Sequence, residues 1–165
     1  MQTKFLLITL LLCGALLHAE EDKLVFRKPF TLELYINKEH SYSEKFPEIP
    51  YTDKGSIYLF KGDEFGVNLN LSDGTIKKIT YQPDLAKADV TFHFTQEIKE
   101  QPPLMMLVIK NNTKERLFMD SVMTMPGKKG ISPTSILPID GGLSDYESWP
   151  HPIIQLVLRN LRLKE

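Results

Sequence analysis

The stretch EFGVNLNLSDGTI, residues 64–76, decides the fold. From Phe65 to Leu71, apolar side chains alternate with small or polar ones, which is typical of a strand with one buried face. The predicted inward residues are Phe65, Val67, Leu69 and Leu71. Asp73 and Gly74 follow, and this dipeptide suits the mirror-image turn that joins two antiparallel strands. The stretch therefore predicts a β-hairpin and, with it, an antiparallel sheet.

The same period of two recurs along the chain. In PFTLELYI (residues 29–36) and DVTFHFTQE (residues 89–97), the predicted inward side chains are Phe30, Leu32, Leu34 and Ile36, and Val90, Phe92 and Phe94. Turn-forming residues separate such segments, as in KGDE at 61–64. QPDLAKAD, residues 82–89, is compatible with one helical turn. We expect strands at residues 24–36 (broken near Pro29), 56–60, 65–71, 75–81, 89–98, 104–110, 116–125, 134–138 and 153–163.

Short strands separated by turns at this density indicate two packed sheets or a barrel. We interpret the chain as all-β, with residues 20–165 forming a single-domain, immunoglobulin-like antiparallel β-sandwich of about eight or nine strands. The Cys and Trp pattern of antibody domains is absent, so this expectation concerns architecture alone. Two longer segments, residues 37–55 and 126–135, read as irregular loops. Loops of this length in a compact domain are often functional.

The N-terminus reads as a secretory signal peptide. Lys4 precedes an apolar run from Phe5 to Leu17, and Ala19 is a small residue before an acidic stretch. We expect cleavage after Ala19. Lipidation at Cys13 is the alternative, disfavoured because the preceding Leu12 is not small. The apolar run is too short for a comfortable membrane span, which needs about 20 residues, and no later segment is a candidate.

Charge and cysteine content narrow the class of protein. Without residues 1–19, the 20 basic residues lose Lys4, so 19 face 21 acidic residues and the net charge is −2. The sequence holds no basic run, so charge gives no reason to expect a nucleic acid or an anionic membrane as partner. The one cysteine lies in the predicted signal peptide. A secreted domain without disulfides points to a bacterial periplasm or cell surface.

Catalytic motifs are weak in this sequence. No Gly-x-Ser-x-Gly elbow occurs, and after residue 19 the only imidazole bases are His40, His93 and His151. Ser144, Asp145 and His151 are close in sequence, which says nothing about a triad because triads assemble from distant parts of a chain. We therefore expect no enzymatic activity and no cofactor. A hydrolase of envelope polymers that uses two carboxylates stays open as an alternative.

A methionine cluster supports the other alternative, a periplasmic copper-binding protein. Its members are Met105, Met106, Met119, Met123 and Met125. Thioethers suit Cu(I), and LVIKNNTKERL (residues 107–117) followed by a late His resembles the periplasmic copper chaperones built on a small β-sandwich. The chain departs from that family at His151-Pro152-Ile153, where the family has His-x-Met. Because methionine also fills gaps in cores, we predict packing and no metal site.

The strongest binding candidates lie in DGGLSDYESWPHPI, residues 140–153, read as a stiff loop before the last strand. They are Tyr146, Glu147, Trp149 and His151, with Tyr42 and Tyr51 of the 37–55 segment as second choice. Aromatic rings with a polar tip suit recognition surfaces. The alternative for Trp149 is a plug at one end of the sandwich. The sequence thus predicts an exported envelope protein that binds another envelope protein or a small ligand through its loops.

Overall fold

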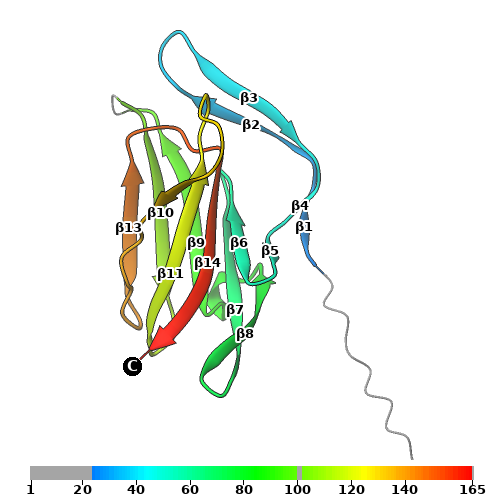
Figure 1. Cartoon of the computed structure of the whole chain (residues 1–165), viewed down its shortest axis with the longest axis vertical. Helices are drawn as coiled ribbons and strands as arrows, with labels where there is room; N and C mark the ends of the chain where they lie inside the picture. Colours follow the sequence, from blue (N-terminus) through cyan, green and yellow to red (C-terminus); the bar gives the residue numbers. More distant parts are fainter. Residues whose placement is uncertain (1–23, 100–101, 165) are drawn as a thin grey trace, which may run out of the picture.

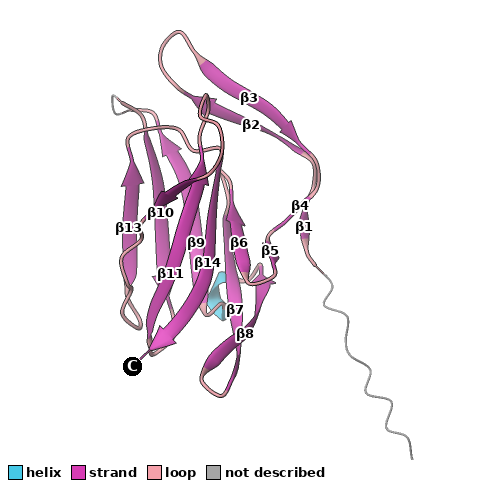
Figure 2. Ribbon diagram, in the orientation of Figure 1, coloured by secondary structure: helices cyan, strands magenta, loops and turns pink. Residues whose placement is uncertain are grey.

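A computed structural model describes residues 24–99 and 102–164 and shows a nearly all-β chain with its sheets packed in two layers (Figures 1 and 2). The predicted all-β class is confirmed, as is the layered packing. The predicted signal peptide, with Cys13, lies outside the described residues. Within them, no helix is long and apolar enough to cross a membrane.

Each layer of the sandwich is a five-stranded antiparallel sheet. The β9 sheet has the order β13 (Ser144–Trp149), β10 (Leu104–Asn111), β9 (Val90–Glu97), β7 (Glu64–Ser72), β8 (Thr75–Gln82). The β14 sheet has the order β12 (Ser132–Thr134), β11 (Arg116–Thr124), β14 (Gln155–Lys164), β6 (Ser56–Leu59), β5 (Thr52–Asp53). The apolar core lies between them, and its fully buried side chains include Phe65, Phe92, Phe94, Leu107 and Leu158.

The first 30 described residues, 24–53, form an N-terminal segment with its own pairings. β1 (Phe26–Arg27) pairs with β4 (Ile49–Pro50), and β2 (Phe30–Tyr35) pairs with β3 (Ser41–Phe46). The predicted break near Pro29 is therefore present. Figure 1 shows the β2–β3 hairpin, in blue and cyan, at one end of the sandwich.

The β2–β3 hairpin is attached by its apolar face and by one side-chain amide. Leu32 and Leu34 are buried, as the alternation predicted. The Tyr35 N–H donates to Gln96 Oε1 at 2.9 Å, and Gln96 Nε2 donates to the Tyr35 carbonyl oxygen at 2.8 Å. Because Gln96 lies on β9, the amide ties the hairpin to the sandwich. The end of the sandwich is thereby covered.

The predicted hairpin at residues 64–76 is confirmed, with one correction. Asp73 and Gly74 have φ values of 51° and 69°, as a mirror-image turn requires. Leu71, predicted to point inward, is 49% exposed, so that prediction is wrong. The register shifts between Asn70 and Leu71 as at a β-bulge, which reverses the faces of the residues that follow. Gly66, predicted outward, is buried, and a Cβ there would lie 2.2 Å from the Ala88 Cβ.

Three segments predicted as loops contain strands. Residues 37–55 contain β3, β4 and β5, residues 126–135 contain β12, and residues 140–153 contain β13. β3 and β13 bury few side chains fully, so their sequences carry little apolar alternation. The predicted strand at 134–138 is also wrong, because β12 ends at Thr134 and Ile139 makes only an isolated bridge to Leu117. The predicted helical turn is present as a 3₁₀ turn over Leu85–Lys87.

Candidate functional site

The N-terminal segment is fixed to the sandwich by the Arg27 side chain. Its Nε donates to Asp63 Oδ1 at 3.1 Å, and its Nη2 donates to Asp63 Oδ2 at 2.6 Å. Nη1 donates to the Pro50 carbonyl oxygen at 3.0 Å, and Nη2 also donates to the carbonyl oxygen of Tyr58. Arg27 is 6% exposed and Asp63 13%, so this is a buried, bidentate ion pair. The guanidinium therefore fastens the chain and is not free to receive a ligand.

Aromatic rings enclose the guanidinium. The Arg27 Cζ lies 4.1 Å from the centre of the Tyr51 ring and 5.1 Å from that of Phe60. Tyr81 stacks on Tyr51 with 4.2 Å between ring centres and an interplanar angle of 25°. Two groups this near one ring centre must occupy opposite faces, so Tyr51 is held between a cation and a second phenol ring. We call Arg27, Asp63, Tyr51, Tyr81 and Phe60 the Arg27 cluster.

The carboxylate of the Arg27 cluster comes from the predicted turn KGDE. Gly62 has a φ of 94°, and the Asp63 N–H donates to the Phe60 carbonyl oxygen at 3.0 Å, which closes the turn. Asp63 Oδ2 in return accepts from the Phe60 N–H at 2.8 Å. Both carboxylate oxygens of Asp63 are thus occupied by donors from this chain.

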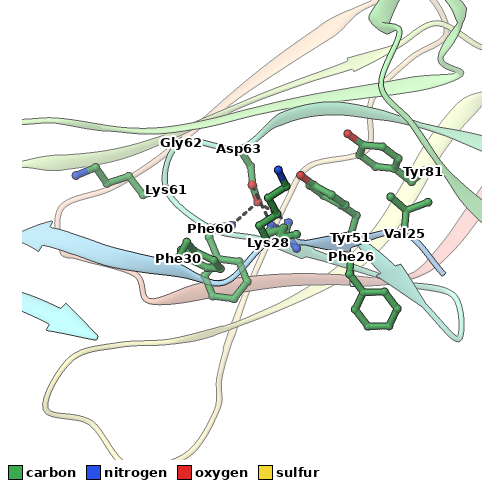
Figure 3. A pocket seen from close by; sticks show the side chains of 11 residues that line it. Val25, Phe26, Lys28, Phe30, Tyr51, Phe60, Lys61, Gly62, Asp63 and Tyr81 are labelled. Atoms are coloured by element: carbon green, nitrogen blue, oxygen red, sulfur yellow. Dashed lines mark hydrogen bonds and ion pairs between the residues drawn. The ribbon is translucent and has the colours of Figure 1, made fainter. Parts of the chain in front are cut away.

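A pocket of about 530 Å³ opens beside this cluster (Figure 3). We call it the N-terminal pocket. Its apolar lining comes from Val25, Phe26, Phe30 and Phe60. Its polar lining comes from Arg27, Lys28, Lys61, Asp63, Tyr51 and Tyr81. Segments distant in sequence therefore meet here: the N-terminal segment, the 60–63 turn and the last part of β8.

Two lysines give the pocket a positive charge. Lys61 Nζ donates to the Glu33 carbonyl oxygen at 2.6 Å, a contact that leaves its charge unneutralised. Neither Lys28 nor Lys61 forms an ion pair with a carboxylate of the described residues. Arg27 and Asp63 neutralise each other. The lining therefore carries two more cations than anions.

The Tyr81 hydroxyl of the pocket keeps its proton at neutral pH. Burial raises the pKa of Tyr81, and the neighbouring Tyr51 raises it further. A phenol with a raised pKa keeps its proton at neutral pH, since its usual pKa is already about 10. The Tyr81 side chain is hydrogen-bonded to that of Tyr51, so this pair of hydroxyls keeps one donor proton for the N-terminal pocket.

Of the six residues predicted to bind, Tyr51 lines the N-terminal pocket. Trp149 is only 7% exposed. Its Nε1 donates to Thr134 Oγ1 at 2.9 Å, and its ring meets Phe94 edge-on at 6.4 Å between centres. Both the ring and the polar tip of Trp149 are thus satisfied inside the sandwich, as the plug alternative expected.

The other predicted residues of β13 point to different faces. Tyr146 is 69% exposed on the outer face, in register with Val108 of β10. Glu147 lies on the same face of β13 as Trp149, in register with the buried Leu107, and accepts from the Leu137 N–H at 3.2 Å. Burial raises the pKa of the Glu147 carboxyl, and the adjacent Asp145 raises it further.

His151 and Tyr42 complete the set. His151 is half-buried, and its Nδ1 is enclosed without a hydrogen-bond partner in the described part of the chain. Tyr42 packs partly against the core from β3, and its hydroxyl donates to Glu44. Figure 1 places β13 at the sandwich edge away from the N-terminal segment. The structure thus does not bring the six residues together.

The pocket residues that sequence reasoning missed are Arg27, Lys28, Lys61, Asp63 and Tyr81. Only the KGDE turn pointed toward Lys61 and Asp63, and it did so as turn chemistry. Arg27 and Lys28 occupy an ordinary strand end, where a basic residue is usually solvated. The partner of Arg27 lies 36 positions away, at Asp63, so no local pattern could show the contact.

The copper-binding and hydrolase alternatives both stay predictions. Met105, Met119, Met123 and Met125 are buried in the hydrophobic core, as packing predicts. The described residues contain no group of three or more His, Cys, Asp or Glu side chains placed to hold a metal ion. The N-terminal pocket has one lining carboxylate, Asp63, whereas glycoside hydrolysis uses two.

Comparison with family models, curated proteins and solved structures finds no match to this chain. The assignment of function therefore depends on the chemistry of the site alone. In that respect the N-terminal pocket offers the largest set of converging polar and aromatic groups described above.

Proposed function

We propose that this chain is an exported, non-catalytic binding protein of the bacterial envelope, and that its ligand occupies the N-terminal pocket. We propose further that its sandwich is immunoglobulin-like, with the binding surface at the connections between strands. Two five-stranded antiparallel sheets packed face to face support that description. The observation that carries the proposal is the pocket of about 530 Å³ beside the Arg27 cluster.

The size and lining of the N-terminal pocket suit a small ligand or a short segment of a partner. Ligand sites are typically clefts of about 300–1,000 Å³ with mostly apolar walls and a few placed polar groups. Here phenylalanine and valine side chains form the walls, while Lys28 and two tyrosine hydroxyls supply the polar groups. The bidentate bonds between Arg27 and Asp63 hold these walls in place before any ligand arrives.

The bonding of the ionisable groups supports a role without catalysis. A general base needs a lone pair free to take a proton. Asp63, the one carboxylate of the lining, accepts from Arg27 with both oxygens and from the Phe60 N–H. Tyr81, with a raised pKa, keeps its proton. Asp63 thus accepts hydrogen bonds that hold the shape of the pocket, and Tyr81 stays a neutral hydroxyl.

Export is tested by processing of the full chain in a bacterial host. The pattern at Lys4, the following apolar run and Ala19 supports a cleaved signal. Intact mass measured on the periplasmic fraction should correspond to a chain that starts at Glu20. A chain kept unprocessed in the cytoplasm, or one carrying lipid at Cys13, would contradict this part of the proposal.

Binding is tested by following backbone amide signals while a chemically diverse panel is added: neutral sugars, short peptides, amphiphiles of each charge. At least one class should shift amides around Lys28, Tyr51 and Tyr81. Val25→Trp, which places bulk in the pocket lining, should remove those shifts. Leu137→Trp, at an exposed position outside the lining, is the matched control and should leave them intact. Shifts absent for the whole panel, or unaffected by Val25→Trp, would overturn the proposal.

A further inference from the structure

We infer that the N-terminal pocket takes an anionic amphiphile: a molecule with an apolar body and one carboxylate or phosphate headgroup. This inference rests on the proposed function, since it names the ligand class of the same pocket. Charge, the distribution of apolar surface, and the state of the hydrogen-bonding groups each support it.

The charge of the lining favours an anion. The Arg27 guanidinium and the Asp63 carboxylate form a closed pair, so the net charge of the pocket comes from Lys28 and Lys61. Lys61 is held by its bond to the Glu33 carbonyl oxygen. The backbone carbonyl orients the Lys61 ammonium without cancelling its charge. Figure 3 shows this ammonium extending away from that of Lys28, so Lys61 adds to the positive potential around the pocket and Lys28 is the lysine that would meet a headgroup.

The pocket lining offers a cationic ligand no free carboxylate to neutralise its charge. Asp63 already accepts from Arg27 and from the Phe60 N–H. The two faces of Tyr51 are taken by Arg27 and Tyr81. The Lys28 ammonium, and the one donor proton left by the hydrogen bond between the Tyr81 and Tyr51 side chains, can meet an anionic oxygen.

Apolar surface continues from the pocket to its outer edge. Leu24, Val25 and Phe26 are three consecutive exposed apolar residues, and Phe26 is 48% exposed. Contiguous exposed apolar surface in a protein of this kind marks a binding region more often than single exposed residues do. Val25 and Phe26 line the pocket itself, so the apolar strip and the cavity form one surface.

The Phe26 ring lies apart from the polar groups of the pocket, while Val25 lies beside Tyr81 (Figure 3). In Figure 3 the Lys28 ammonium and the hydroxyls of Tyr51 and Tyr81 extend to one side, and the Phe26 ring extends to the other. Such a division orients an amphiphile, with its headgroup toward the lysine and hydroxyls and its apolar body along Phe26. A uniformly polar ligand such as a sugar would leave the apolar side uncovered.

The test uses eight-carbon probes that stay monomeric: octanoate, octyl phosphate, octyl glucoside and octyltrimethylammonium, with calorimetry for the dissociation constants. We expect the two anionic probes to bind at least tenfold more tightly than octyl glucoside, and the cationic probe to bind most weakly. The advantage should shrink at high salt, because exposed charges are screened. Amide signals of Tyr51 and Tyr81 report whether each probe occupies the pocket.

Lys28→Glu should abolish the preference for anionic probes while amide shifts from octyl glucoside persist. Lys129→Glu makes the same charge change at an exposed residue outside the pocket lining and should leave the preference unchanged. If octyl glucoside binds in the pocket as tightly as octyl phosphate, the ligand class is wrong and the proposed binding function survives. If neither these probes nor the broader panel reaches the pocket, both fail.

Vesicles distinguish the two sources of an anionic headgroup. Flotation with phosphatidylglycerol vesicles, absent with phosphatidylcholine vesicles and lost in Lys28→Glu, assigns the headgroup to a lipid surface. Binding of the monomeric anionic probes without flotation assigns it to a free metabolite of the same chemistry. If the Lys28→Glu variant still floats with phosphatidylglycerol vesicles, the pocket is not the site that binds the anionic headgroup.

Discussion

Trp149 and Tyr51 are two aromatic residues for which the sequence offers the same interpretation, yet the structure places them differently. Each ring is packed against other rings: Trp149 against Phe94, and Tyr51 against Tyr81 and Phe65. The indole N–H of Trp149 is bonded to Thr134 inside the sandwich. Tyr51, in contrast, lines the N-terminal pocket. Both rings are therefore packed against other rings, but only Tyr51 of the two also lines the N-terminal pocket.

The charged side chains near Trp149 and near Tyr51 also have different roles. At β13, Glu147 lies on the inward face of an edge strand, a device that discourages pairing with another chain. At the N-terminal segment, charge is neutralised within the wall by Arg27 and Asp63 and left free at the rim by Lys28. β13 forms the protected edge of its sheet, whereas the N-terminal segment forms the wall of a pocket. This comparison is tested by the three variants that follow.

Trp149→Ala should give the largest loss of stability. Replacing a buried aromatic residue by alanine costs about 3–5 kcal/mol through lost burial and the cavity left behind. We expect urea denaturation to show a lowered midpoint without a large change in slope. The amide shifts of the N-terminal pocket on addition of octyl phosphate should persist under conditions where the variant is still folded.

Tyr146→Ala is the matched control for Trp149, three positions earlier on the same strand. Its ring lies on the outer face and is mostly exposed, so the change in unfolding free energy should stay within about 0.5 kcal/mol. If Trp149→Ala were as mild as Tyr146→Ala, the indole would not be a packing residue. The contrast drawn between β13 and the N-terminal segment would then fail.

Arg27→Ala should cost about 3 kcal/mol, the lower end for breaking a buried ion pair, because Asp63 keeps some exposure to solvent. Two backbone carbonyl oxygens also lose their donor. Unlike Trp149→Ala, this change should weaken probe binding as well, since Arg27 fixes the pocket wall. Denaturation and calorimetry on the same preparation measure both effects.

Arg116→Ala is the control for Arg27. Arg116 forms an ion pair with Asp140 in which both side chains are exposed. Exposed pairs contribute about 0–1 kcal/mol, so stability and probe binding should change little. Equal effects of the two arginine substitutions would show that burial of the Arg27 pair has no structural consequence, which contradicts its assigned role.

Strand alternation predicted the fold well where one face is buried along the whole strand. Val90, Phe92 and Phe94 are buried as expected because β9 lies in the middle of its sheet. Leu71 failed because a bulge changes the register, and nothing in a period of two encodes a bulge. β13 was missed because an edge strand with Ser144, Asp145 and Glu147 lacks apolar alternation.

The candidate site was less predictable than the fold, for a different physical reason. The N-terminal pocket depends on contacts between residues about 30 positions apart, such as Arg27 with Asp63 and with the Tyr58 carbonyl oxygen. The net charge of the whole sequence is near neutral, so it gave no sign that the fold brings Lys28 and Lys61 to one pocket. Within the described residues, neither lysine forms an ion pair with a carboxylate. The sequence favoured Trp149 and Tyr51 equally because both are aromatic. It does not show that the Trp149 indole N–H finds a hydrogen-bond acceptor inside the sandwich.

Glu147→Gln should give the smallest effect, and its sign depends on pH. Burial and the neighbouring Asp145 raise the pKa of Glu147 in the folded state, so the folded chain holds this proton more tightly than the unfolded chain. Stability from this group is therefore greatest below its unfolded pKa, about 4.3, and falls as pH rises through the higher folded value. A glutamine at this position keeps a side-chain oxygen that can accept from the Leu137 N–H, but it has no carboxyl group to titrate.

We therefore expect Glu147→Gln to match the original protein near pH 4 and to be more stable near pH 7, by less than about 1 kcal/mol because solvent screens the carboxylate. Urea midpoints at the two pH values measure the difference. If Glu147→Gln were destabilising at pH 7, the charged form would be the one that β13 favours. The inward carboxylate would then act as an anchor for the Leu137 N–H, and its role would resemble that of Asp63 in the Arg27 cluster.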